Sequence, residues 1–188
     1  MSSSPLTLAN HLLVAAPSLQ QDPFTRSVGL ICQHDADGAM AVLVNQPSEY
    51  TLGDVFSQIG IACADADLQA VPVLNGGPVH ADRGFVLHDD ARHWGSSLTV
   101  AEGLFLTTSR DILQAMADGH GPRNALVALG CAGWGPGQLE NELAENSWLT
   151  VPSDGAILFQ VPLSARWHGA AGLLGVDMAH LADYSGRA

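Results

Sequence analysis

Two apolar runs joined by a short acidic turn constrain the fold more than any other feature of this chain. The runs cover residues 27–34 and 39–45 and are rich in β-branched side chains. Their connection, Asp35-Ala36-Asp37-Gly38, ends in Asp-Gly, the dipeptide that favours a tight hairpin turn. A β-hairpin with antiparallel strands is therefore expected over residues 27–45.

The remaining elements are expected from periodicity and from capping residues. Strands are predicted over residues 11–16, 71–74, 85–88, 97–100, 103–107, 124–129, 147–151 and 156–161. Helices are predicted over 51–59, packed on the hairpin, and over 110–117, 138–145 and 162–174. Because strands outnumber helices and hairpins imply antiparallel pairing, the predicted class is α+β with a mixed sheet.

The length and composition indicate one folded domain. The chain has 188 residues, of which 47% are hydrophobic and 14% charged, far from the composition of disordered proteins. No internal repeat, linker or low-complexity segment divides it. A single domain is expected over residues 1–188, with residues 1–8 flexible.

The charge balance is strongly acidic. Nineteen acidic residues stand against seven arginines, lysine does not occur, and the formal net charge is −12. Proteins that bind nucleic acids or anionic membranes neutralise phosphate groups with clustered Lys and Arg. Direct nucleic-acid binding and membrane association are therefore not expected.

The cysteines and the N-terminal residues bear on the compartment. Cys32, Cys63 and Cys131 are widely separated and form no C-x-x-C pair, which favours reduced thiols. The first ten residues lack the basic and apolar regions of a secretory signal, and no apolar run approaches the roughly 20 residues that span a bilayer. We expect a cytoplasmic protein.

The segment 130–148 is the first candidate for a functional surface, with Trp134, Gln138, Glu142 and Trp148 as candidate binding residues. An apolar strand is followed by a glycine-rich loop and a helix, an order in which backbone N–H groups can hold an anion. The glycine spacing does not match a nucleotide-binding motif, however, and Glu140 in the first helical turn would repel phosphate. A neutral or cationic ligand, or a protein partner, is preferred. Alternatively, the glycines only allow a tight connection.

A second candidate segment is residues 75–88. Gly76 and Gly77 would let the backbone approach a ligand or a neighbouring chain closely. Arg83 could bind a carboxylate or phosphate through its planar guanidinium, or could instead pair with Asp82 or another acid. His88 closes the segment.

An enzyme of unrecognised class is an alternative function. Arg26 or Arg83 would then bind an anionic group, and His34 or His88 would act as acid or base. No G-x-S-x-G or H-E-x-x-H motif occurs. Neither a metal nor a cofactor is expected. Cys131 is either a reactive thiol activated by the following helix or a small buried residue.

Taken together, these segments resemble the YqgE/AlgH family of bacterial proteins over about residues 8–188. The motifs that carry the resemblance are Arg26-Ser27-Val28, Gly76-Gly77-Pro78-Val79, Asp82-Arg83-Gly84-Phe85-Val86-Leu87-His88, Gly130-x-Ala132-Gly133-Trp134 and Gly137-Gln138-Leu139-Glu140. The resemblance implies branching β-sheets curled into a pseudo-barrel, with helices packed outside. Two departures from the family pattern are Gln46, where Arg is usual, and Cys131, where Tyr is usual.

The resemblance implies little about function, because the family has no established catalytic residues or cofactor. Its label of transcriptional regulator comes from a genetic link with alginate synthesis. Our leading interpretation is a cytoplasmic regulatory or interaction protein that binds a protein or small ligand at segments 76–88 and 130–148. Direct DNA binding is disfavoured by the charge and by the lack of a basic recognition helix.

Overall fold

The computed structural model describes residues 6–175. Of the segment 1–8 expected to be flexible, residues 1–5 lie outside this range. Leu8 lies inside it, and its backbone N–H donates a 3.0 Å hydrogen bond to Nδ1 of His34.

The described elements are strands and short helices in the following order. The strands are β1 (His11–Ala15), β2 (Val28–Asp35), β3 (Gly38–Leu43), β4 (Pro47–Thr51), β5 (Pro72–Asn75), β6 (Val79–His88), β7 (Ser97–Ala101), β8 (Leu104–Thr107), β9 (Ala125–Trp134) and β10 (Trp148–Pro152). The helices are α1 (Leu52–Gln58), α2 (Ala66–Gln69), α3 (Arg110–Ala117), α4 (Gln138–Ala144), α5 (Gly155–Phe159) and α6 (Arg166–Leu173), with a 3₁₀ turn at Leu163–Ala165 before α6. No helix in this range is long and apolar enough to cross a membrane.

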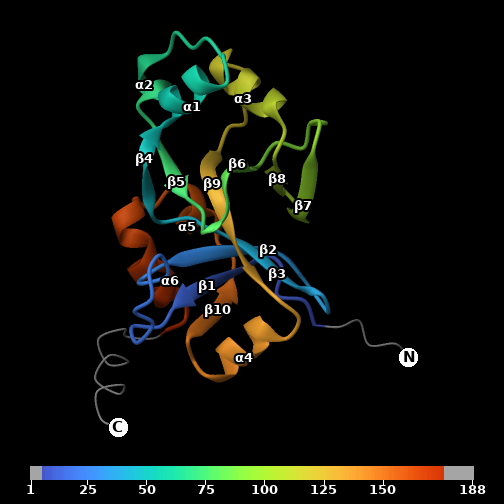
Figure 1. Ribbon diagram of the computed structural model, residues 1–188, viewed down its shortest axis with the longest axis vertical. Helices are drawn as coiled ribbons and strands as arrows, with labels where there is room; N and C mark the ends of the chain where they lie inside the picture. The colour runs from blue at the N-terminus through green and yellow to red at the C-terminus, as the bar shows by residue number, and fades with distance from the viewer. Residues whose placement is uncertain (1–5, 176–188) are drawn as a thin grey trace.

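Strand β9 joins two parts of one sheet. Residues 125–129 pair antiparallel with β6, and residues 128–129 also pair in parallel with β5, whereas residues 132–134 pair antiparallel with β3. The main path of the sheet is β10-β1-β2-β3-β9-β6-β8-β7, and β4 and β5 branch from it. Figure 1 shows β9 running from the upper part, with α1, α2 and α3, to the lower part, which α4 caps. This strongly curled, branched α+β architecture confirms the expected fold class.

Three glycines allow the strands to cross where the sheet branches. A Cβ added to Gly76 would lie 2.2 Å from the carbonyl oxygen of Gly130, and one added to Gly130 would lie 2.2 Å from that of Gly77. A Cβ on Gly77 would lie 2.3 Å from the backbone of Cys131. Gly77 and Gly130 also have φ of 142° and 80°, which side chains disfavour. The close approach expected at Gly76 and Gly77 is therefore made to strand β9.

Because of the same strand crossing, the glycine-rich loop expected after residue 129 is shorter than predicted. Residues 130–134 were expected to leave the sheet, but β9 continues through them to Trp134. After Gly130, Cys131 still pairs with Val79 of β6, and residues 132–134 then pair with β3. The loop is thereby reduced to Gly135–Gly137.

Helix α1 lies in the upper part of the molecule. Thr51 and Asp54 form a reciprocal capping box at its start, and Leu52 and Phe56 are buried in a cluster with Val73 and Ile112. The expectation that this helix packs on the 27–45 hairpin is therefore wrong. Strand β4, which was not predicted, carries the chain away from the hairpin before α1 begins.

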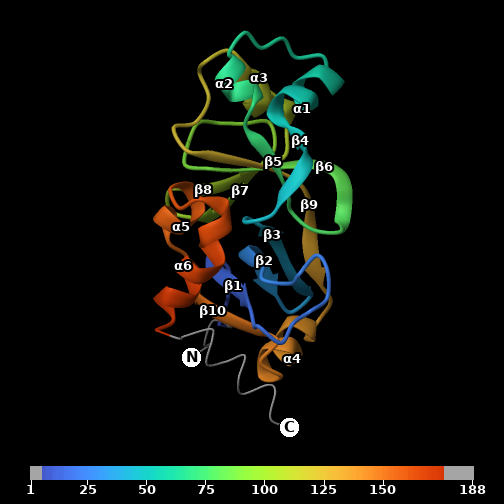
Figure 2. The ribbon, with the colours of Figure 1, turned by 90° about the vertical axis from the view of Figure 1, so that its left-hand side faces the viewer.

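Residues 156–161 were expected to be a strand, but residues 155–159 form α5. Oδ1 of Asp154 accepts the N–H groups of Ala156 and Ile157 at 2.8 and 3.3 Å, which starts a helix. A run of five or six apolar residues has too little periodicity to separate a helix from a strand. In Figure 2, α5 and α6 lie along one side of the lower strands, while α4 closes their lower end.

Candidate functional site

Four of the candidate residues meet in one depression, which we call the aromatic groove. Trp134, Gln138, Glu142 and Trp148 line this space of about 330 Å³. The remaining lining comes from Gly133, from Pro78 and from a loop outside the candidate site segments, with Leu19, Gln21, Asp22, Pro23 and Phe24.

Helix α4 is set beside the groove by a tight turn and a buried leucine. The backbone N–H of Gly135 donates a 3.0 Å hydrogen bond to Oε1 of Gln138, closing the turn between β9 and the helix. Leu139 is buried in the cluster beneath the helix. Since residues four apart share a helical face, Gln138 and Glu142 both reach the groove.

Three aromatic rings form a continuous row in the groove. The Trp134 and Trp148 rings meet edge to face with centroids 6.0 Å apart, and Phe24 meets Trp148 in the same manner at 5.7 Å. Such contacts add to the stability gained from burial. Gln46 supports the loop that carries Phe24, because its Nε2 donates to the carbonyl oxygen of Pro23 at 2.5 Å.

The groove carries negative charge beside its rings. The indole N–H of Trp134 donates to Oε2 of Glu142, while Oε1 of Glu142 has no hydrogen-bond partner within the described residues. Asp22 adds a second carboxylate, and within residues 6–175 no Arg or His side chain lines the groove. The arrangement therefore suits a cationic or neutral hydrogen-bond donor and opposes an anion.

His34 lies against α4 but does not line the aromatic groove. Its Nδ1 accepts the N–H of Leu8, and its Nε2–H donates to Oε1 of Glu140 at 2.5 Å, so both ring nitrogens have protein partners. The hydrogen bond from His34 lowers the pKa of Glu140. His34 thus joins the N-terminal segment, β2 and α4.

His88 is a core residue with no exposed surface. Its Nδ1 accepts the N–H of Asp90 at 3.1 Å, its Nε2–H donates to Oγ1 of Thr107 at 2.6 Å, and its ring stacks on Phe105. Burial lowers the pKa of His88, which favours the neutral ring.

The two candidate arginines lie elsewhere. The Arg26 guanidinium stands over the ring of Trp167 at 5.2 Å, and Arg83 stands over Phe85 at 5.8 Å and makes a long, 3.5 Å hydrogen bond to Thr108. The ion pairs of the described residues are His34–Glu140 and Arg92–Asp90, so the expected pairing of Arg83 with Asp82 or another acid does not form there.

These contacts do not bring together the arginine and the histidine that the enzyme alternative requires. Within the described range, no hydrogen bond links Arg26 or Arg83 to either His34 or His88. Residues 6–175 also contain no group of three or more His, Cys, Asp or Glu side chains placed to hold a metal ion.

The thiols near the strand crossing are buried. Burial raises the pKa of Cys131, and it raises that of Cys32 to about 12. A raised pKa keeps the unreactive thiol form. Of the two interpretations of Cys131, the small buried residue is the one that agrees with the structure.

A family model described as AlgH-like matches residues 12–179. The chain belongs to the AlgH-like family. A UPF0301 protein of Stenotrophomonas maltophilia is 68% identical over 186 residues, which cover 99% of each chain. A UPF0301 protein of Xanthomonas campestris pv. campestris is 66% identical over 188 residues and all of both chains. The membership expected from the motifs is confirmed.

Two solved structures resemble this one. The solution structure of the AlgH protein from Pseudomonas aeruginosa matches with a TM-score of 0.80 and 42% identity, covering 97% of this chain and 96% of that one. A Corynebacterium diphtheriae protein matches with a TM-score of 0.69 and 23% identity over 89% and 87% of the two chains, which shows a shared fold. These similarities establish the family and the fold but no specific biochemical function.

Proposed function

We propose that this protein is a cytoplasmic regulatory or interaction protein whose aromatic groove binds a basic side chain of a partner protein. The observation that carries the proposal is the Glu142 carboxylate, held by the indole N–H of Trp134 at the edge of the ring row. One carboxylate oxygen is oriented by this bond, and the other has no partner among the described residues.

A basic side chain matches this chemistry in two ways. An ammonium or guanidinium can form a charge-assisted hydrogen bond with Glu142, and a cation that lies over the face of an aromatic ring gains further attraction. Because the carboxylate is already held by Trp134, less ordering is needed on binding. Asp22 supplies additional negative charge.

The charge of the whole chain supports the same class of partner. A net charge of −12 attracts basic proteins over a long range and raises their association rate. It also repels nucleic acids, so regulation would act through a protein partner instead of DNA. A small amine would match the groove for the same reasons and is the alternative ligand.

The free thiols Cys32, Cys63 and Cys131 suit a reducing cytoplasm.

The test compares interaction partners of four full-length proteins by affinity capture and quantitative mass spectrometry. Glu142→Gln removes the charge and retains the shape, and Trp134→Phe removes the indole N–H. Glu145→Gln is the matched control, because it removes one acid from the end of the same helix outside the groove. For each partner captured by the unmodified protein, Kd is then measured with purified components at two salt concentrations.

Partners that depend on the groove should be lost with Glu142→Gln and kept with Glu145→Gln. Loss of a charge-assisted hydrogen bond should weaken binding by roughly tenfold or more. The salt dependence should fall in the same variant. If folded Glu142→Gln and Trp134→Phe bind every partner as the unmodified protein does, the groove is not the binding site.

A further inference from the structure

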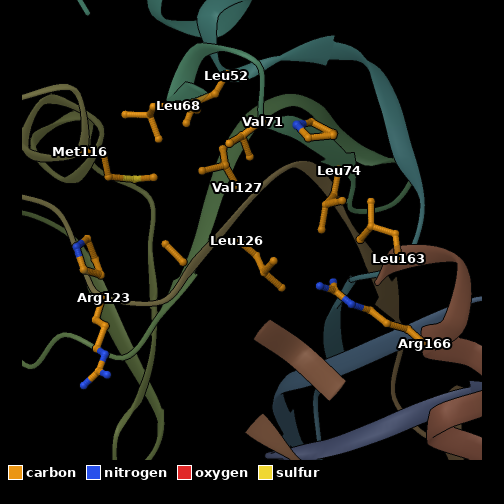
Figure 3. Close-up of a pocket in the computed structure, with 13 residues that line it drawn as sticks. Leu52, Leu68, Val71, Leu74, Met116, Arg123, Leu126, Val127, Leu163 and Arg166 are labelled. Atoms are coloured by element: carbon orange, nitrogen blue, oxygen red, sulfur yellow. The ribbon is translucent and has the colours of Figure 1, made fainter. Parts of the chain in front are cut away.

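A second cavity, separate from the aromatic groove, lies between α6 and the upper helices. It has a volume of about 350 Å³, and none of its lining residues lines the groove. Figure 3 shows Leu52, Leu68, Leu74, Leu126 and Val127 around the space, with Arg166 at one end. Its size falls within the roughly 300–1,000 Å³ typical of small-molecule sites.

Arg166 contributes a buried positive charge to this apolar wall. The residue is 5% exposed, its Nε–H donates to the carbonyl oxygen of Val161 at 2.9 Å, and Nη1 donates to that of Val44 at 2.5 Å. A guanidinium has five N–H donors, so further donors remain available. In Figure 3 the guanidinium points toward Leu126, into the space.

No acidic side chain among residues 6–175 forms an ion pair with Arg166. Buried charges in proteins are normally paired, because removing an ion from water is costly. Burial lowers the pKa of Arg166, yet a guanidinium remains protonated at neutral pH. The carbonyl groups of Val44 and Val161 offset part of the free-energy cost of burying this charge, but they carry no net negative charge.

We propose that this cavity binds an aliphatic monocarboxylate. The carboxylate accepts the remaining N–H donors of Arg166, and the hydrocarbon chain lies along Leu74, Leu126 and Val127. One buried guanidinium matches one carboxylate in charge and in planar geometry. The only other charged lining residue, Arg123, is exposed. The lining therefore offers few hydrogen-bonding partners to a ligand whose body is strongly polar.

The cavity lies where both parts of the molecule meet. Leu52 and Leu68 belong to α1 and α2, Leu126 belongs to β9, and Arg166 begins α6. A bound acid would contact all of these elements together. The site is independent of the aromatic groove, so either proposal can fail without the other.

The experiment titrates the full-length protein with sodium butanoate, hexanoate and octanoate by isothermal titration calorimetry. Amide chemical shifts of the isotope-labelled protein locate the site. Octan-1-ol tests the requirement for the carboxylate, and inorganic phosphate tests for a general anion site. N-acetyl-leucyl-leucine tests whether the same carboxylate chemistry is better supplied by a peptide C-terminus.

Three variants separate charge, space and fold. Arg166→Met replaces the cation by an apolar side chain and also removes the bonds to Val44 and Val161, so its fold is checked by circular dichroism. Ala125→Leu keeps Arg166 and fills part of the cavity. Arg110→Gln is the matched control, because it removes an exposed arginine that bonds to Ile59 outside the cavity.

Octanoate is expected to bind, with affinity rising about fourfold for each added methylene until the cavity is filled. Octan-1-ol, Arg166→Met and Ala125→Leu should each weaken binding at least tenfold, and Arg110→Gln should not. The proposal is overturned if octanoate does not bind at millimolar concentration, if octan-1-ol, phosphate or the peptide acid binds as tightly as octanoate, or if folded Arg166→Met or Ala125→Leu binds octanoate unchanged.

Discussion

The indole N–H of Trp134 donates a hydrogen bond to the carboxylate of Glu142, and this contact joins the last residue of β9 to the middle of α4. The rings of Trp134 and Trp148 also meet edge to face, with centroids 6.0 Å apart. The groove thus has a tryptophan and a carboxylate that orient one another. Their coupling can be measured directly.

Trp134→Phe and Glu142→Gln should be energetically coupled. A hydrogen bond to a charged acceptor contributes roughly 1.5–3 kcal/mol, less where water reaches the pair, so we expect a coupling of about 1 kcal/mol in a double-mutant cycle. The free energy of unfolding is measured in urea at pH 7. Trp134→Phe combined with Glu145→Gln should be additive; coupling equal to that of the Glu142 pair would assign the effect to general charge.

His88 should make stability depend on pH. Its pKa is lowered in the folded protein by burial, so below its unfolded value of about 6.5 the unfolded chain takes up a proton that the folded chain does not. This contribution to stability is present above that pH and is lost as the pH falls. The urea midpoint should therefore decrease between pH 7.5 and 5.5.

In the His88→Gln variant, the urea midpoint should decrease less between pH 7.5 and 5.5 than it does in the unmodified protein. The carboxylates with lowered pKa, Asp90, Asp111 and Glu140, lose their contributions only at more acidic pH, below about 4. They do not interfere in the chosen window. An identical pH dependence for the variant and the unmodified protein would contradict the assignment.

His34→Gln should raise the pKa of Glu140 toward its ordinary value, because the hydrogen bond from the imidazole favours the ionised carboxylate. Nuclear magnetic resonance of the side-chain carboxyl carbon measures this pKa. The effect on unfolding should be small, since Glu140 is half-exposed and water screens the pair. An unchanged Glu140 pKa in the variant would show that the contact is weak in solution.

Gly130→Ala should destabilise the protein strongly. The added methyl would lie 2.2 Å from a carbonyl oxygen, and φ is 80°, so overpacking and backbone strain add to a cost of about 3 kcal/mol or more. Urea unfolding gives the value. Gly84→Ala on β6 is the control, because nothing lies within 4 Å of the new methyl, and its cost should stay below about 1 kcal/mol.

Local sequence patterns were sufficient to predict the elements whose own residues contain a clear turn motif or a clear periodicity. The Asp35–Gly38 turn pairs β2 with β3 as expected, and Oδ1 of Asp35 accepts the N–H of Asp37 at 2.8 Å inside that turn. Helix α3 begins and ends at the predicted residues. Side-chain periodicity and turn chemistry act over a few residues, so the sequence expresses them directly.

Only part of the candidate site could be predicted from such local patterns. Trp134, Gln138, Glu142 and Trp148 are close in sequence, and their position around one helix was predictable. The loop with Asp22 and Phe24 was not predicted to belong to the site, because its place in the groove depends on contacts made with residues more than 100 positions away. Arg166 in a helix made mostly of small and apolar residues was a signal, but its burial depends on Val44 and on the cavity walls.

By itself the sequence determined the α+β class, most elements, the acidic charge and the family. Tertiary structure decided where β9 changes partners, that residues 155–159 are helical, and which arginine is buried. Strand pairing and burial are set by non-local contacts that compete for the same apolar surface, and a short run of residues carries no record of which contact is made. The aromatic groove and the Arg166 cavity both result from those contacts.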